Sequence, residues 1–263
     1  MHTPIARNFA VASENKIHSD EVAARLGFTG ALVPGVAVFG HLTWPLTKQW
    51  GADWLASSTV STRFLKPAYD GERLSITHRD ANGSISVEAR NQNGLLLATL
   101  ACALTPPPPP NERAQWRGRD ESPTRAEIAW DNLIVDEPFA PYAWTPDAAH
   151  NADYAARLDD DTALFQHGVL HPHALLSQAN QALVRRYLMP AWIHTGSEIR
   201  FRRLLRVGDS IEVRAVPIEK WEKKGHQFVK LYVAYVRGDE LTTEIEHTAI
   251  FKVAAPAQGS AAS

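Results

Sequence analysis

The chain has 263 residues, 44% of them hydrophobic, so it can build one or two folded domains and is not a disordered polypeptide. Its 27 lysines and arginines nearly balance 29 aspartates and glutamates, and a net charge of −2 gives no electrostatic reason to expect a nucleic-acid partner. The single cysteine, Cys102, excludes an internal disulfide and a zinc site built on several thiolates.

The sequence predicts a cytoplasmic protein that has no membrane partner. The first residues lack the charged start and apolar run of a secretory signal peptide. The longest nearly apolar stretch, Ala31–Phe39, is too short to span a bilayer. Because the chain has one cysteine, a reducing compartment is the simplest interpretation.

The first part of the chain is predicted to be a helix followed by an antiparallel meander. Ala31–Leu46 is apolar almost all round, as expected of a buried helix. Asn93-Gly94 is a hairpin signal near the end of the meander. Alternation with period two predicts strands at Thr59–Leu65, Arg73–Thr77, Ser84–Ala89 and Leu95–Leu104.

A run of five prolines, Pro106–Pro110, indicates a boundary. Consecutive prolines cannot join a helix or an inner strand, and they favour a stiff polyproline II spacer. The polar stretch that follows extends this predicted linker over residues 106–123. It divides the chain into residues 1–105 and 124–255, and residues 256–263 are expected to be a flexible tail.

The two parts repeat each other at a constant offset. Arg63-Phe64 is followed 137 residues later by Arg200-Phe201 (201 − 64), and Gly71 by Gly208 (208 − 71). Apolar residues between Leu175 and Leu183 recur at helical spacing, so the second part also contains a helix before its strands. We therefore expect an α+β protein in which each half is a long helix wrapped by a curved antiparallel sheet.

This duplicated unit resembles the double hotdog fold, and one stretch of sequence resembles a specific family. Asn15-Lys-Ile-His18, followed by Gly27-Phe28 and Val33-Pro34-Gly35, is similar to the signature of MaoC-type (R)-specific enoyl-CoA hydratases and dehydratases. The resemblance implies an N-terminal hotdog over residues 1–105 that carries the hydratase-like motif. It also implies a second hotdog over residues 124–255.

The resemblance implies three functional residues in the first half. His18 falls on the catalytic histidine of the family, Asn15 on its motif asparagine, and Gly35 on the glycine whose N–H begins the central helix. The family's aspartate falls on Ser13. In the second half the position that matches His18 is Ala155 (155 − 18 = 137), so the sequence predicts one site per chain.

Hydration of an enoyl thioester needs a base for water, an acid for the α-carbon and donors for the thioester oxygen. His18 would move the proton, the Gly35 N–H would bind the oxygen, and Asn15 would orient the water or the histidine. Ser13 is no base at neutral pH without help. Three alternatives stay open at this point. Glu14, which is the closer carboxylate in sequence, turns inward and replaces the aspartate. Alternatively Asp20 turns inward. In the third alternative, Ser13 holds the water and His18 acts alone.

Several polar residues of the second half are candidates for a functional role. His167, His171 and His173 have loose spacing and no acidic or thiol ligand beside them, so we expect no metal and no cofactor. His171 is instead expected to line the substrate tunnel, with Asn180 facing the same cavity. Candidate contacts for the phosphates of coenzyme A, or a charged strand edge, are Arg202, Arg203, Arg206, Lys220, Lys223 and Lys224.

The resemblance implies a hydro-lyase that adds or removes water at a 2-enoyl or 3-hydroxyacyl thioester of coenzyme A or acyl carrier protein, acting as a homodimer. Two alternatives stay open. One is a thioesterase on the same fold, in which a carboxylate activates water. The other is a catalytically silent protein that binds acyl thioesters, because the family aspartate is replaced by Ser13.

Overall fold

The computed structural model describes residues 2–119 and 124–254, which form one large antiparallel sheet around two long helices. The helices are α2 (Gly35–Trp50) and α6 (Pro172–Arg186). The strands of the large sheet are β1 (Ser58–Phe64), β2 (Leu74–Ala81), β3 (Ser84–Asn91), β4 (Leu96–Ala103), β6 (Tyr142–Trp144), β8 (Ile193–Phe201), β9 (Ile211–Lys223), β10 (His226–Arg237) and β11 (Glu240–Lys252).

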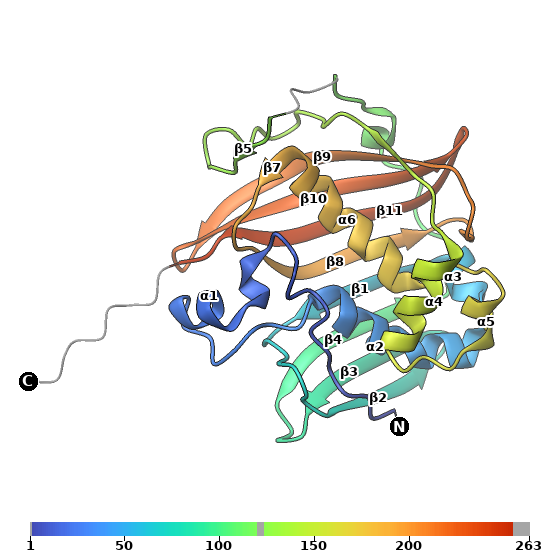
Figure 1. Ribbon diagram of the computed structural model, residues 1–263. Helices are drawn as coiled ribbons and strands as arrows, with labels where there is room; N and C mark the ends of the chain where they lie inside the picture. The colour runs from blue at the N-terminus through green and yellow to red at the C-terminus, as the bar shows by residue number, and fades with distance from the viewer. Residues whose placement is uncertain (1, 120–123, 255–263) are drawn as a thin grey trace, which may run out of the picture.

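The strand order in this sheet is β2-β3-β4-β1-β8-β11-β10-β9-β6. The strands of the first half, cyan to green in Figure 1, adjoin those of the second half, orange to red, and α2 and α6 lie side by side on one face. The expected α+β architecture, with each helix wrapped by a curved antiparallel sheet, is therefore confirmed. None of the described helices has the length and apolar character that a membrane-spanning helix needs.

The short elements lie around this frame. The 3-10 helices are η1 (Lys16–His18) and η2 (Glu112–Gln115). The short α-helices are α1 (Asp20–Arg25), α3 (Asp53–Ala56), α4 (Ala148–Arg157) and α5 (Ala163–Gln166). Strands β5 (Ala126–Glu127) and β7 (Tyr187–Leu188) pair in parallel as a separate two-stranded sheet.

Helix α2 begins four residues later than the apolar pattern predicts. Pro34 is its N-cap residue (φ −55°, ψ 132°), and a proline is tolerated at a helix start because it has no N–H that would need a partner. The apolar residues before it are extended instead: Leu32 bridges to Tyr69, and Val33 N–H donates to Ala68 O at 2.8 Å. Both arrangements bury apolar side chains, so hydrophobicity alone did not distinguish them.

Strands β1 and β8 join the two halves, and their register matches the sequence repeat. Ser61 lies directly opposite Glu198, and its Oγ donates to Glu198 Oε1 at 2.9 Å across a separation of 137 residues. In an antiparallel pair, equivalent residues of two related halves face each other only at the two-fold axis between them. The 137-residue offset found in the sequence therefore corresponds to a local two-fold axis between β1 and β8.

The proline-rich segment lies against the second half. Arg202 Nη2 donates to Pro108 O at 2.7 Å, and Asn111 N–H donates to Glu244 Oε1 at 2.9 Å. Ala114 of η2 is buried in a small apolar cluster with Tyr232 and its neighbours. The domain boundaries proposed from the sequence stay predictions. The last part of the predicted linker, residues 120–123, and the predicted flexible tail, residues 256–263, lie outside the described residues.

We expect Leu42→Ala in α2 and Leu176→Ala in α6 each to lower the free energy of unfolding by about 2–5 kcal/mol, because both side chains are fully buried. Because the halves share one sheet, each variant should unfold in a single urea transition. The exposed Leu95→Ala is the control, expected within about 0.5 kcal/mol of wild type. Two separate transitions would contradict a shared cooperative unit.

Acid should destabilise the fold through its buried imidazoles. Burial lowers the pKa of both His41 and His247 to about 3. In the unfolded chain the pKa of both groups is about 6.5, so as the pH falls the unfolded state takes up protons before the folded state does. Their contribution to stability is present above about pH 6.5 and is lost as the pH falls below it. The urea midpoint should drop between about pH 7 and about pH 5, and less steeply in His247→Gln. An unchanged midpoint would contradict the buried, neutral assignment.

Candidate active site at the seam between the two halves

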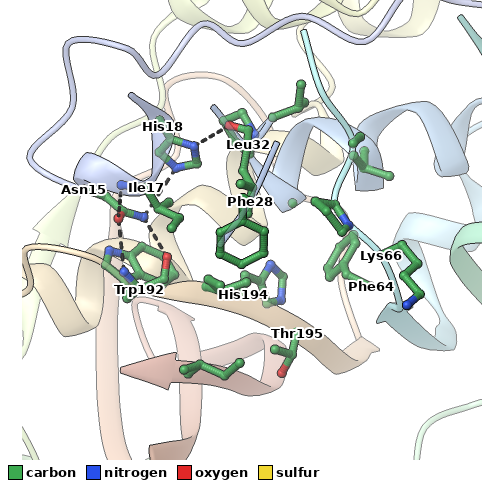
Figure 2. Close-up of a pocket in the computed structure, with 18 of the residues that line it drawn as sticks. Asn15, Ile17, His18, Phe28, Leu32, Phe64, Lys66, Trp192, His194 and Thr195 are labelled. Atoms are coloured by element: carbon green, nitrogen blue, oxygen red, sulfur yellow. Dashed lines mark hydrogen bonds between the residues drawn. The ribbon is translucent and has the colours of Figure 1, made fainter. Parts of the chain in front are cut away.

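A largely apolar cavity of about 270 Å³ lies where the N-terminal segment and the start of α2 meet β8 and α6 (Figure 2). Its apolar wall includes Ile17, Phe28, Leu32, Val38, Phe64 and Ile250. Its polar residues are Asn15, His18, Lys66, Asn180, His194, Thr195 and His226. The cavity therefore draws its lining from both halves of the chain.

His18 is a neutral imidazole with a defined tautomer. Its Nδ1 lies 2.7 Å from Leu32 O, and because a carbonyl oxygen only accepts, Nδ1 carries the hydrogen and donates it. Its Nε2 lies 3.3 Å from Asn15 Nδ2, which donates to it (Figure 2). Burial lowers the pKa of His18, partly opposed by the hydrogen bond to Leu32 O. The lone pair of Nε2 is the basic group of this site, and it becomes available to a bound molecule when the 3.3 Å contact with Asn15 Nδ2 opens.

Asn15 clamps the N-terminal segment to the second half. Its Oδ1 accepts from Trp192 N–H at 3.1 Å and from Ile17 N–H at 3.3 Å. Its Nδ2 donates to Trp192 O at 3.0 Å and to His18 Nε2. These four contacts use the whole hydrogen-bonding capacity of the carboxamide. Of the two roles expected for Asn15, the geometry fits orientation of the histidine and leaves nothing with which to hold a water.

The structure does not bring Ser13, Glu14 or Asp20 into the cavity. Ser13 Oγ donates to Asn15 O at 3.2 Å, outside the cavity lining. Glu14 is exposed and pairs with Arg125 at 2.9 Å, and this contact lowers the pKa of the Glu14 carboxyl. Asp20 accepts from Ala31 N–H at 2.8 Å and holds the turn before α2. Neither carboxylate turns inward, because each is held by a partner outside the site.

The N-terminus of α2 opens on the cavity at Gly35. Ala37 N–H and Val38 N–H donate to Pro34 O, so the Gly35 N–H lies at the free end of the helix, and no acceptor for it is recorded among the described residues. A Cβ at Gly35 would lie 3.3 Å from His194 Nδ1, so a glycine allows this close approach. Free N–H groups and the helix dipole favour an oxygen that gains negative charge.

His171 lies elsewhere, and this placement corrects the expectation that it lines the tunnel. It is fully buried, and its Nδ1 accepts from His173 N–H at 3.1 Å, which caps the start of α6. Its Nε2 lies 3.4 Å from Asp160 Oδ2. Both ring nitrogens are therefore used in local structure. Asn180, by contrast, does line the cavity from α6.

The second half keeps the hydrogen-bond pattern of the site without its imidazole. Asn151 Nδ2 donates to Val169 O at 3.0 Å, and Val169 is the counterpart of Leu32 (169 − 32 = 137). Asn151 thus takes the place that His18 has in the first half. Sequence register pointed to Ala155, one helical turn later, because α4 replaces the short η1 segment. In the part of the chain that the structure describes, this position holds no proton carrier.

No sequence pattern indicated a role for His194, which is a lone histidine in a strand. It is 6% exposed, stacks on His247 with ring centroids 4.0 Å apart, and contacts Phe64 edge to face. Burial lowers its pKa well below the usual range. Only its position in β8, opposite the start of α2, makes it part of the site, and that position depends on pairing between residues far apart in sequence.

The basic clusters considered for coenzyme A do not line the cavity. Arg202 pairs with Glu244, and Arg203 pairs with Glu240 at 2.6 Å. Lys220 donates to the carbonyls of the loop that contains Trp130. The cation in the cavity lining is Lys66, which is exposed at the end of β1. Among the described residues, no group of three or more His, Cys, Asp or Glu side chains could hold a metal ion.

Comparison with known proteins gives likeness in structure but not in sequence. No family model matches the chain, and no curated protein matches its sequence. A MaoC domain protein dehydratase from Chloroflexus aurantiacus matches with a TM-score of 0.65 and 11% identity, over 95% of this chain and 94% of that one. A MaoC-like dehydratase matches with a TM-score of 0.59 and 12% identity, over 95% and 96%.

A third solved structure carries the name of the fold. It is a conserved protein of Mycobacterium tuberculosis with a double hotdog fold, and it matches with a TM-score of 0.61 and 13% identity, over 95% of this chain and 93% of that one. The match covers both halves and the junction between them. The chain therefore has the double hotdog fold, in the form that MaoC-like dehydratases have.

Proposed function

We propose that the protein is a hydro-lyase that adds water to, or removes it from, an acyl thioester of coenzyme A or acyl carrier protein, the substrate being a 2-enoyl or 3-hydroxyacyl group. One observation carries the proposal. The neutral imidazole of His18 and the free N-terminus of α2 line the same apolar cavity. A base beside an anion-stabilising helix end is what reversible proton transfer next to a thioester carbonyl requires.

In the hydration direction the thioester oxygen accepts from the Gly35 N–H. The water displaces the Asn15 Nδ2–H from His18 Nε2, which takes one proton from that water as the hydroxyl adds to C3. Negative charge moves to the thioester oxygen. The imidazolium then gives that proton to C2, so one water is consumed and His18 returns to its starting state. The Leu32 carbonyl, which accepts from Nδ1–H, stabilises the imidazolium while it carries the proton.

This scheme uses a single proton carrier and needs no carboxylate. The described residues that line the cavity include no Asp or Glu. For this reason the thioesterase alternative, which requires a carboxylate to activate water, has no specific observation in its favour. A silent thioester-binding protein would bind an acyl thioester without turnover. The homodimer and the cytoplasmic location stay predictions.

We expect His18→Ala to lower the rate of hydration by about 10²–10⁴-fold, because it removes the proton carrier. The assay follows loss of the conjugated-thioester absorbance with but-2-enoyl-CoA and oct-2-enoyl-CoA. His78→Ala, an exposed histidine of β2, is the control and should keep the wild-type rate. Release of free thiol would indicate a thioesterase, and tight binding without turnover a silent protein. Full activity in His18→Ala would refute the site.

Ser13→Asp restores the residue type of the family motif but should not increase the rate. The Ser13 side chain donates to Asn15 O outside the cavity lining, and an ionised aspartate would lose this hydrogen bond. We expect equal or lower turnover in the same assay, with a lower melting temperature. A rate increase of about tenfold or more would show that this position does reach the reacting atoms.

A further inference from the structure

The ring of His194 has one hydrogen-bonding group that the fold does not use. Its Nε2 lies 3.2 Å from Gly196 O and 2.9 Å from Ser197 Oγ. Because the Gly196 carbonyl only accepts, Nε2 carries the hydrogen. Ser197 Oγ in turn contacts His247 Nδ1 at 3.1 Å. This buried chain fixes the ring and leaves Nδ1 with a lone pair.

The lone pair of Nδ1 has no donor among the described residues, although His194 is only 6% exposed. The Nδ1 atom is itself covered, so a bound molecule reaches it only when the cavity wall around it shifts. A buried acceptor without a donor is costly, and such groups in native proteins are commonly satisfied by a water or a ligand. Nδ1 is 3.3 Å from the position of a Cβ on Gly35, so it lies beside the helix end at which the thioester oxygen binds. His194 also lines the cavity itself (Figure 2).

The proposed reaction calls for an acceptor of this kind. The reacting water has two O–H groups, and His18 Nε2 accepts only one of them. Asn15 Oδ1 already accepts from the Trp192 and Ile17 N–H groups, and the Ser13 side chain lies outside the cavity lining. Both residues that the family motif would offer for the water are thereby excluded. The second acceptor has to come from another part of the cavity wall.

We propose that His194, from the second half of the chain, accepts a hydrogen bond through Nδ1 from the water that adds to C3, and equally from the 3-hydroxyl in the reverse direction. This inference rests on the proposed function. His18 carries the proton between the water oxygen and C2. His194 accepts from the remaining O–H of that water, so that its oxygen faces C3. His194 gains and loses no proton in the cycle, so the atom balance is unchanged.

The test compares two leaving groups in the elimination direction. The 3-hydroxyl of 3-hydroxybutanoyl-CoA can donate to Nδ1, whereas 3-chlorobutanoyl-CoA has no O–H there. In both substrates His18 removes the C2 proton and the same but-2-enoyl-CoA forms. The hydroxyl takes that proton from His18 and leaves as water, whereas chloride leaves as the anion and His18 loses its proton to solvent. Absorbance of the conjugated product measures both rates, after the spontaneous loss of chloride is subtracted.

His194→Phe keeps an aromatic ring for packing and removes the lone pair. We expect its kcat for the 3-hydroxy substrate to fall at least about tenfold, with elimination of chloride much less affected. His194→Asn can place its Oδ1 near the position of Nδ1 and should recover part of the loss. Ser197→Ala loosens the ring but leaves the lone pair, so it should change both rates by the same factor.

The alternatives give different results. Equal slowing of both eliminations in His194→Phe, or no slowing of either, would overturn the role of His194 while the proposed function stands. Loss confined to Asn180→Leu, whose Oδ1 also has no partner among the described residues, would move the role to α6. A wild-type protein that performs neither elimination would refute the proposed function itself. His194→Met replaces His194→Phe if circular dichroism shows that the latter does not fold.

Discussion

The pairing of β1 with β8 is the contact on which the rest of the molecule depends. It turns two sheets into one, in a register that places Ser61 opposite Glu198. A slip of one residue would send every side chain of β8 to the opposite face. His194 would then leave the cavity and Trp192 would no longer meet Asn15. The local symmetry of the sheet thereby sets the position of the candidate site as well as the fold.

The two halves have kept the same frame and have come to differ in what they place on it. In the first half the loop before the central helix carries His18. In the second half the helix α4 brings Asn151 to the equivalent carbonyl, and His171 closes the start of α6 with its own ring. These differences keep the local hydrogen bonds satisfied and leave no imidazole at the place that matches His18. The second half thus supports the site of the first half with Asn180 and His194.

Much of the fold could be predicted from the sequence because it follows from local periodicity. The hairpin at Asn93-Gly94 is one example, and the helix at Leu175–Leu183 is another. The end of β2 was missed: beyond Thr77 the strand is exposed on both faces, so the alternation disappears where the chain no longer covers a helix. The 137-residue register was also visible, since both copies kept the glycines and aromatic residues that shape their turns.

The sequence prediction of the candidate site rests on one short segment. His18, Asn15 and Gly35 lie within one motif, and all three line the cavity. The position of the Glu14 carboxylate depends on its ion pair with Arg125, which is 111 residues away in the sequence. Nothing in the motif itself indicates this partner. His194 likewise enters through strand pairing. Residues that act through partners distant in sequence leave no trace in local spacing, which is why they had to be found in the structure.

The docked proline-rich segment has a consequence for how a substrate reaches the seam. Glu244 is fully buried and holds the segment through Asn111 N–H, while Arg202 binds both Glu244 and Pro108 O. Prolines also restrict the unfolded chain, so less conformational entropy is lost when the segment docks. A connection held in this way is fixed against the second half and does not act as a hinge between the halves. We therefore expect the shared sheet to stay closed while a substrate enters the cavity.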